Sequence, residues 1–403
     1  MKTIGQKEFI VLMAMLMSFV ALAIDAMLPA LGQIGISLNV QNNNDIQLII
    51  SSIFLGMGFG LMIFGPLSDS YGRKPAIYGG IIIFIFGCII SYYSQTFEVM
   101  LLGRAFQGLG AASSRVITLA MIRDKYEGNA MAKIMSLIMI IFILVPAIAP
   151  SIGQAILIFG EWRYIFGFMG SLAAIGLAWF FVRQPETLKP EYRQPFRFSN
   201  ILIGIKETVK NKTARSFTIS SGLIFSSFVG YLSSSQQILQ VQYGLGDMFS
   251  IYFGVLALSI GMASFANSRW VMKYGMLNLC IRSLKVLSSA AFIFIMVTYF
   301  FKGHPPLPML MSYLMITFFC LGLLFGNFNA LAVQPLGHIA GVANSVISSS
   351  QTLISVILGG TVGFFYNGTV FPMIIGFLIF GLCSLYLTVR ISKAQKAIER
   401  AKS

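Results

Sequence analysis

Charged side chains are scarce in this chain of 403 residues, where they make up 10% of the sequence and only 13 residues are acidic. A typical soluble domain carries about a quarter charged residues. Hydrophobic residues account for 57% of the chain, so too few polar side chains remain to cover a surface that faces water. The scarcity excludes a soluble globular protein and predicts an all-α membrane protein for which lipid is the main solvent.

Metal ligands are also scarce. The four cysteines lie inside or beside apolar runs and form no Cys-x-x-Cys pair, and the two histidines, His304 and His338, fall in different loops. We expect the cysteines to be small apolar packing residues. The sequence contains no nucleophile–base pair, ligand cluster or phosphate-binding loop, so it predicts no enzyme, no metal site and no cofactor.

Long apolar runs are abundant, and a membrane-spanning helix needs about 20 apolar residues. Twelve such segments can be placed, at about 8–31, 46–67, 75–94, 97–121, 134–158, 164–182, 214–239, 249–267, 277–300, 308–332, 340–366 and 370–390. Six precede and six follow a basic segment, 183–213, that contains three prolines. We therefore expect an N-terminal half at 1–182, a linker at 183–213, a C-terminal half at 214–390 and a tail at 391–403.

The net charge of +15 follows the expected loops. All but four of the 28 Lys and Arg residues fall in alternate loops, the middle segment or the tail. The exceptions are Arg163 and Lys302 in the opposite loops, and Arg104 and Arg115 within the fourth span. Because Lys and Arg concentrate on the cytoplasmic side of membrane proteins, we expect both termini and the linker to be cytoplasmic. The alternation indicates membrane topology rather than a surface that binds nucleic acid.

A weak internal repeat relates the two halves. GPLSDSYGRKP at 65–75 follows the second span of the first half, and NSRWVMKYGM at 267–276 follows the second span of the second half. Both contain Tyr-Gly, but methionines stand in the second copy where the first has Asp69 and Arg73. The repeat predicts two six-helix halves related by pseudo-two-fold symmetry.

Asp25, in the first span, is the one acidic residue expected at membrane depth. A carboxylate there is costly unless it is paired or protonated. It can carry a proton or bind substrate, or it can be a buried partner that neutralises an arginine. Arg104 in the fourth span lies at a matching depth, and protonation of Asp25 would leave this arginine alone. The two residues are candidates for a pair that couples proton occupancy to conformation.

Arg115 is a second arginine in the fourth span. It follows Arg104 by eleven residues, which at about 100° per residue places both on one face of the helix. Arg115 can meet an anionic substrate group or a lipid phosphate, or its long side chain can reach the cytoplasmic surface.

Several spans carry prolines or polar side chains that lipid disfavours. Pro146 and Pro150 fall within the fifth span, where prolines free backbone carbonyls and bend a helix. Polar side chains in the seventh, tenth and eleventh spans either join helices or line a cavity. As a set they predict a polar substrate cavity. Its candidate lining residues are Arg115, Tyr231, Ser235, Gln236, Asn327, Asn329 and Gln351.

Several motifs resemble those of a known family. GPLSDSYGRKP resembles the loop signature of major facilitator transporters, and LLGRAFQGLGAA at 101–112 resembles their R-x-x-Q-G-x-G-A-A pattern. Asp25 and the Met-Leu-Pro shortly after it resemble the D-M-Y-L-P pattern of the Bcr/CflA group of drug exporters, as do APSIG, EWRYIF and PET. The chain departs from the antiporter motif at Ala149 and Gln154, and Leu28 replaces the usual tyrosine.

The resemblance implies the major facilitator fold and a proton-coupled antiporter of the bacterial inner membrane, which exports small amphipathic drugs or metabolites by alternating access. The polar spans also fit a transporter of one physiological solute, such as an amino acid, a siderophore or a sugar. In both cases we expect a monomer whose partners are a small-molecule substrate, protons and the lipid bilayer.

The resemblance also implies roles for named residues in three groups. These groups are the proton-coupling pair Asp25 and Arg104, the antiporter motif with Pro146, Pro150 and Gly153, and a cytoplasmic charge cluster of Asp69, Arg73 and Asp124.

Overall fold

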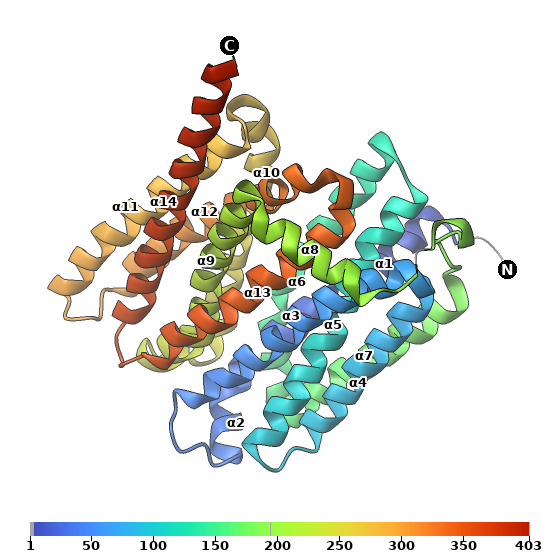
Figure 1. Ribbon diagram of the computed structural model, residues 1–403. Helices are drawn as coiled ribbons and strands as arrows, with labels where there is room; N and C mark the ends of the chain where they lie inside the picture. Colours follow the sequence, from blue (N-terminus) through green and yellow to red (C-terminus); the bar gives the residue numbers. More distant parts are fainter. Residues whose placement is uncertain (1–3, 194, 403) are drawn as a thin grey trace. The chain divides into compact units, whose positions relative to one another are not determined.

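The protein is built of helices. A computed structural model describes residues 4–193 and 195–402, and no strand occurs within these ranges (Figure 1). The chain divides into two compact units, Met1–Ile201 and Leu202–Ser403. The all-α prediction is confirmed.

The first unit contains the helices of the expected N-terminal half and one short turn, η3, of the expected linker. In chain order they are α1 (Gln6–Asp25), η1 (Leu28–Ala30), α2 (Leu31–Ser37), η2 (Asp45–Gln47), α3 (Leu48–Tyr71), α4 (Arg73–Tyr92), α5 (Phe97–Lys125), α6 (Gly128–Phe159), α7 (Arg163–Arg183) and η3 (Pro190–Tyr192). Glycines bring α3 and α5 close together. A Cβ at Gly56 would lie 1.9 Å from the carbonyl oxygen of Ala105, and a Cβ at Gly108 would lie 1.8 Å from the carbonyl oxygen of Ile53. This approach fixes α5, and with it Arg104, against α3.

The second unit begins within α8 (Phe198–Lys210), because the division between the units in the sequence falls between Ile201 and Leu202. Its further helices are α9 (Lys212–Ser235), η4 (Gln236–Gln242), η5 (Gly246–Met248), α10 (Phe249–Tyr274), α11 (Met276–Phe300), α12 (Leu307–Val333), η6 (Gln334–Ile339), α13 (Ala340–Phe364) and α14 (Phe371–Lys402).

Hydroxyl groups are frequent where α9 packs along α13. Several of them donate to carbonyl oxygens one turn earlier on their own helix. Ser226 donates to Gly222 at 2.7 Å, Ser234 donates to Gly230 at 2.8 Å, and Thr352 donates at 2.9 Å to the carbonyl four residues before it. These three hydroxyls are therefore satisfied within their own helices, whereas Ser227, Ser233 and Ser349 have no hydrogen-bond partner for Oγ among the described residues.

Ten segments of the described residues are long and apolar enough to cross a membrane. One of them, Leu307–Phe364, contains both α12 and α13, and the apolar run described in α6 is Leu144–Phe159. The multi-pass prediction is confirmed, while the count of twelve spans stays a prediction. Gln194 of the expected linker and Ser403 of the expected tail lie outside the described residues.

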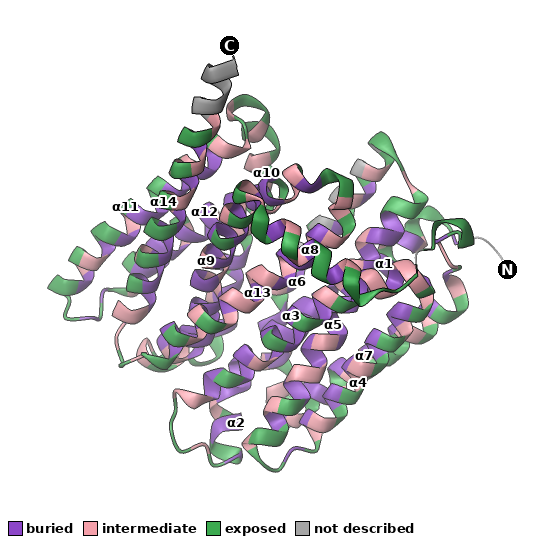
Figure 2. Ribbon diagram, viewed as in Figure 1, coloured by how far each residue is buried: buried purple, intermediate pink, exposed green. Residues whose placement is uncertain are grey.

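Figure 2 shows exposed residues along the long helices, and many of the exposed residues are large and apolar. On α4, Ile82, Phe86 and Ile89 are each at least half exposed and recur at helical spacing. A stripe of this kind faces lipid in a membrane protein.

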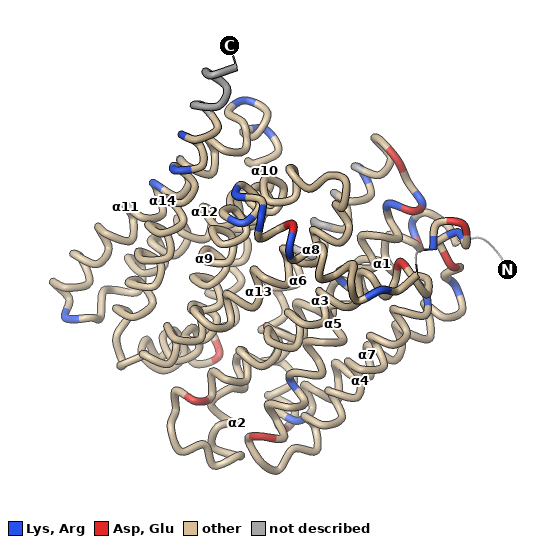
Figure 3. The backbone as a smooth tube through the Cα atoms, in the orientation of Figure 1, with Lys and Arg blue, Asp and Glu red and all other residues tan. Residues whose placement is uncertain are grey.

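Figure 3 shows that charged residues are sparse along the long helices and gather at helix ends and connections.

Candidate functional site

Asp25 is the last residue of α1 and is only 5% exposed. The helix ends there because Pro29 has no N–H group to donate to the Asp25 carbonyl, which is the bond that would continue the helix. In the part of the chain that the structure describes, Asp25 forms no ion pair. Its carboxyl group thus lies at a break in a buried apolar segment, without a counter-ion in the described ranges.

Gly153 of α6 packs directly against this break. A Cβ at Gly153 would lie 1.7 Å from the carbonyl oxygen of Ala26, so the approach requires glycine. Pro146 and Pro150 lie in the same helix, which continues through both of them. The three residues expected to form the antiporter motif therefore belong to the helix that contacts the residue after Asp25.

Arg104 of α5 is fully buried and is held by backbone carbonyls. Its Nη2 donates to the carbonyl of Ala23 at 2.7 Å, and its Nε donates to that of Ile49 at 3.5 Å. The direct Asp25–Arg104 pair expected from matched depth is not formed among the described residues. Carbonyl groups in the last turn of a helix lack intrahelical donors, so the end of α1 offers Arg104 an acceptor two residues before Asp25.

Gln107 extends the contacts of Arg104 to α4. Its Oε1 accepts from Nη1 of Arg104, and its Nε2 donates to Ser91 Oγ at 3.2 Å. Both Gln107 and Ser91 are fully buried. Sequence reasoning did not single out Gln107, although its spacing of three residues from Arg104 places the two side chains on one helix face. The resulting polar network joins α1, α3, α4 and α5.

Arg115 lies three turns beyond Arg104 on α5 and is partly buried. Among the described residues it has no hydrogen bond or ion pair. Contact with an anionic substrate and extension to the membrane surface both stay predictions for this side chain.

Asp69, Arg73 and Asp124 lie together at the ends of α3, α4 and α5. Arg73 donates from Nε and Nη2 to the two carboxylate oxygens of Asp124, at 2.8 and 3.3 Å. Its Nη1 donates to Asp69 and, at 2.9 Å, to Ser68 Oγ. Arg73 is only 6% exposed, so its charge is buried between two carboxylates. A bidentate arginine–carboxylate pair with a second carboxylate fixes the geometry of all three helix ends.

Glu186, in the expected linker, lies beside this charge cluster. Its Oε1 accepts from the backbone N–H of Arg73 and its Oε2 from that of Lys74, both at 3.0 Å, so it caps the first turn of α4. Gly72 has a φ of +108°, and a Cβ there would lie 2.6 Å from Glu186 Oε2. Sequence reasoning missed this role. The Pro-Glu-Thr motif was visible, but it does not reveal a partner 113 residues away along the chain.

Tyr231, Ser235 and Gln236 lie where α9 passes into the π-helix η4. Tyr231 is buried, with its ring edge-on to Phe318 and 4.8 Å between the ring centroids. Ser235 Oγ donates to a carbonyl of its own helix at 2.9 Å, and Gln236 Nε2 donates to Gln240 Oε1 at 3.0 Å. Short π-helical turns are frequent at functional sites.

The asparagines of α12 join helices of the second unit. Asn327 Nδ2 donates to Asn267 Oδ1 of α10 at 2.7 Å, and Asn329 Nδ2 donates to Asn344 Oδ1 of α13 at 3.1 Å. Gln351 of α13 is partly buried, and its Nε2 has no hydrogen-bond partner among the described residues. Two of the expected cavity residues are therefore engaged between helices, while Gln351 keeps a free amide.

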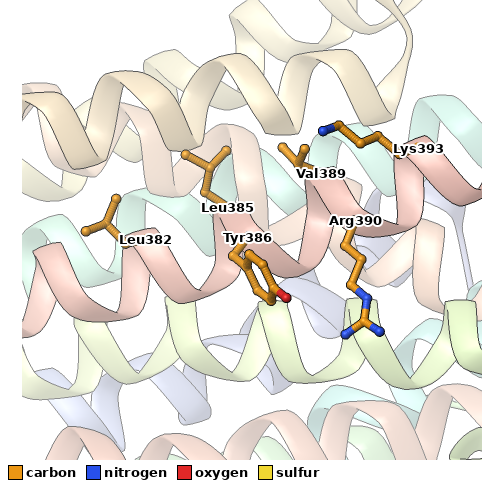
Figure 4. A pocket seen from close by; sticks show the side chains of 6 residues that line it. All are labelled: Leu382, Leu385, Tyr386, Val389, Arg390 and Lys393. Carbon is orange, nitrogen blue, oxygen red and sulfur yellow. The ribbon is translucent and has the colours of Figure 1, made fainter.

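A hollow on α14 differs from the polar cavity expected from the sequence (Figure 4). It is lined by Leu382, Leu385, Tyr386, Val389, Arg390 and Lys393. All six side chains come from one helix, and none belongs to the expected cavity. The hollow is thus part of the surface of α14.

Within the described ranges, no group of three His, Cys, Asp or Glu residues could hold a metal ion.

Known proteins resemble this chain along most of its length. The Major Facilitator Superfamily profile matches residues 9–360. A bicyclomycin resistance protein homolog from Haemophilus influenzae is 27% identical over 91% of each chain, and multidrug resistance protein MdtL from Shewanella oneidensis is 24% identical over 93% of each. The xylose transporter XylE from E. coli, solved in a partially occluded inward open conformation, aligns over 96% of both chains with a TM-score of 0.72 and 13% identity. This last likeness concerns the fold alone.

Proposed function

Because this chain belongs to the Major Facilitator Superfamily, we propose that it is a proton-coupled antiporter that exports small amphipathic compounds by alternating access. The family and the similar proteins are transporters, so the chain is a multi-pass membrane transporter and not an enzyme. The resemblance to the Bcr/CflA group is confirmed by the bicyclomycin resistance homolog. Export of drugs or metabolites is the activity that such relatives support.

The buried carboxyl group of Asp25 is the observation that carries the coupling proposal. An ionised carboxylate at this place has no counter-ion among the described residues, whereas a protonated carboxyl needs none. Arg104 is held at Ala23, two residues away. We propose that deprotonation draws Arg104 from the Ala23 carbonyl to the Asp25 carboxylate, and that protonation returns it. The proton would then select between two arrangements of α1 and α5.

The cytoplasmic charge cluster supports the same cycle. Asp69, Arg73 and Asp124 tie the ends of three helices, and Glu186 fixes the backbone of Arg73. We propose that this cluster forms in one state of the cycle and keeps these helix ends together.

Substrate contacts are proposed for the second unit and for α5. Tyr231, Ser235, Gln236 and Gln351 combine an aromatic ring, a hydroxyl and amide groups, which suits compounds that are apolar with a few polar atoms. Arg115, which lacks a partner among the described residues, is the proposed contact for an anionic group.

The free amide of Gln351 also favours a second candidate, a transporter of one physiological solute. Amide and hydroxyl groups bind sugars and amino acids through hydrogen bonds, and an unmade bond in such a site rejects analogues strongly. For either candidate we propose a monomer in a bacterial inner membrane, with both termini cytoplasmic, as the distribution of Lys and Arg indicates.

The test is growth of an efflux-deficient bacterium that expresses the chain, over a panel of neutral, cationic and anionic toxic compounds. Asp25→Asn is compared at equal expression, and Asp45→Asn, an acid in the connection before α3, is the matched control. We expect protection against some compounds, lost in Asp25→Asn and kept in Asp45→Asn. Protection that survives Asp25→Asn contradicts the coupling role, and no protection at all favours the single-solute candidate.

A further inference from the structure

The linker between the two predicted halves carries a helix with an exposed apolar stripe. On α8, Phe198, Leu202 and Val209 are 64%, 54% and 51% exposed. These residues are spaced by four and seven positions, so they lie in one line along the helix. An exposed line of large apolar side chains needs a partner that covers it.

The opposite face of α8 is already packed. Thr208 is 3% exposed, and a Cβ at Gly204 would lie 2.6 Å from Cγ1 of Val342 on α13. The carboxylate of Glu207 lies 2.8 Å from Nε2 of His338 in η6. These contacts hold α8 against the second unit and leave the apolar stripe on the outside.

Positive charge lies beside the stripe. Lys206 and Lys210 are exposed, and at about 100° per residue they fall on the side of the helix next to Leu202. The one acidic residue of α8 is Glu207, which is engaged with His338. The exposed surface of α8 therefore combines an apolar stripe with two lysines, and the one acid of the helix is engaged with His338.

The position of α8 places it next to the membrane. The span Lys212–Gln242 begins two residues after α8 ends at Lys210. Asn211 separates the helices, because its Oδ1 accepts from the N–H groups of Thr213 and Ala214, both at 3.0 Å, and so starts α9 anew. Figure 1 shows α8 leaving α9 at an angle rather than extending it.

We infer that α8 is an interfacial helix that docks on anionic lipid headgroups, with its apolar stripe at the acyl boundary and Lys206 and Lys210 at the phosphates. A stable protein interface buries about 800 Å² per partner, which three partly exposed side chains do not supply. The lipid occupant also matches the sign of the charge. That the leaflet is the cytoplasmic one rests on the proposed topology.

The experiment places a spin label on the full-length protein in nanodiscs. Leu202→Cys and Val209→Cys report on the stripe, and Ser199→Cys reports on the lysine side of the helix. All are made with Cys383→Ser, because Cys88, Cys280 and Cys320 are buried. Accessibility to oxygen, which concentrates in lipid, is compared with accessibility to a water-soluble nickel complex. The bilayers are phosphatidylcholine alone and phosphatidylcholine mixed with phosphatidylglycerol.

We expect oxygen to dominate at 202 and 209 and the nickel complex at 199, with a larger contrast in phosphatidylglycerol. Lys206→Gln with Lys210→Gln should reduce the contrast to that in phosphatidylcholine, whereas Lys273→Gln with Lys285→Gln, two exposed lysines of the same unit, should not. Equal water access at all three labels overturns the inference. If the contrast is the same with and without phosphatidylglycerol, and is unchanged by the lysine substitutions, the preference for anionic lipid is overturned. Spectral broadening between labels that disappears on dilution with unlabelled protein would mean that a second copy covers the stripe.

Transport is not read in this experiment, so its failure is distinct from failure of the proposed antiport. Labelling of Ser199→Cys in intact cells by a membrane-impermeant thiol reagent tests the leaflet separately. Labelling from outside would place α8 on the periplasmic side and overturn the cytoplasmic assignment.

Discussion

Gly153 and Ala26 are in backbone contact: a Cβ at Gly153 would lie 1.7 Å from the carbonyl oxygen of Ala26. Any larger residue at 153 must therefore push α6 away from the break that follows Asp25. Gly153→Ala is expected to lower the free energy of unfolding by about 1–3 kcal/mol, as overpacking does, and to abolish transport. The measurements are thermal unfolding in detergent and uptake into inverted vesicles. Gly79→Ala, where a Cβ would meet nothing within 4 Å, should change neither quantity.

Arg104 is expected to tolerate no other cation. Arg104→Lys keeps the charge but cannot donate to Ala23, Ile49 and Gln107 in the fixed planar arrangement of a guanidinium. Leaving buried acceptors unpaired costs about 1–3 kcal/mol, so unfolding should occur at a lower temperature and transport should fall. Arg123→Lys is the control, since Arg123 is exposed and donates to its own helix. Normal transport by Arg104→Lys would mean that charge alone suffices.

Glu186→Gln should slow transport without removing its dependence on Asp25. Glutamine keeps one acceptor oxygen, and the NH2 group that replaces the other cannot accept from the Lys74 N–H, so the first turn of α4 loses part of its cap, at a cost of about 1 kcal/mol. The backbone beside Arg73, at the start of α4, is then held less firmly. Glu191→Gln is the matched control, because Glu191 lies in the same linker and its pair with Lys189 is mostly exposed. Equal rates for both variants would restrict Glu186 to a structural role.

Asn327 is expected to join α10 and α12 rather than bind substrate. A double-mutant cycle of Asn327→Leu and Asn267→Leu should give a coupling of about 0.6 kcal/mol in the free energy of unfolding, the average for hydrogen bonds between membrane helices. Substrate affinity of the folded variants should change little. A large loss of affinity with no coupling between the two positions would instead support the cavity role predicted from the sequence.

The sequence was sufficient to predict the helical class, the multi-pass character and the burial of Asp25, because each follows from composition and apolar run length. It also predicted that Asp25 and Arg104 lie at matching depth, and Arg104 does donate to the carbonyl of Ala23, two residues before Asp25. Depth, however, does not determine the direction in which a side chain points. The acceptor at Ala23 exists because Pro29 ends α1 nearby, and that local break decides where the guanidinium binds.

Contacts between distant segments were harder to predict. Glu186 and Arg73 are 113 residues apart in the chain, and no periodic pattern connects a linker carboxylate with a helix start. Gly153 was visible as part of a motif, but its contact with Ala26 depends on how α6 lies against α1. In the linker, α8 is a short amphipathic helix within a segment that prolines and basic residues had marked only as a connection.

The hydroxyl groups of α9 and α13 have a mechanical consequence. The hydroxyls of Ser226, Ser234 and Thr352 each donate to a backbone carbonyl of their own helix. Displacing α9 along α13 by a fraction of a turn therefore breaks none of these bonds, and the resistance comes from side-chain packing alone. Resistance to such a displacement therefore comes from close contacts such as that of Gly230 with Val362, where a Cβ on the glycine would lie 2.9 Å from Val362 Cβ.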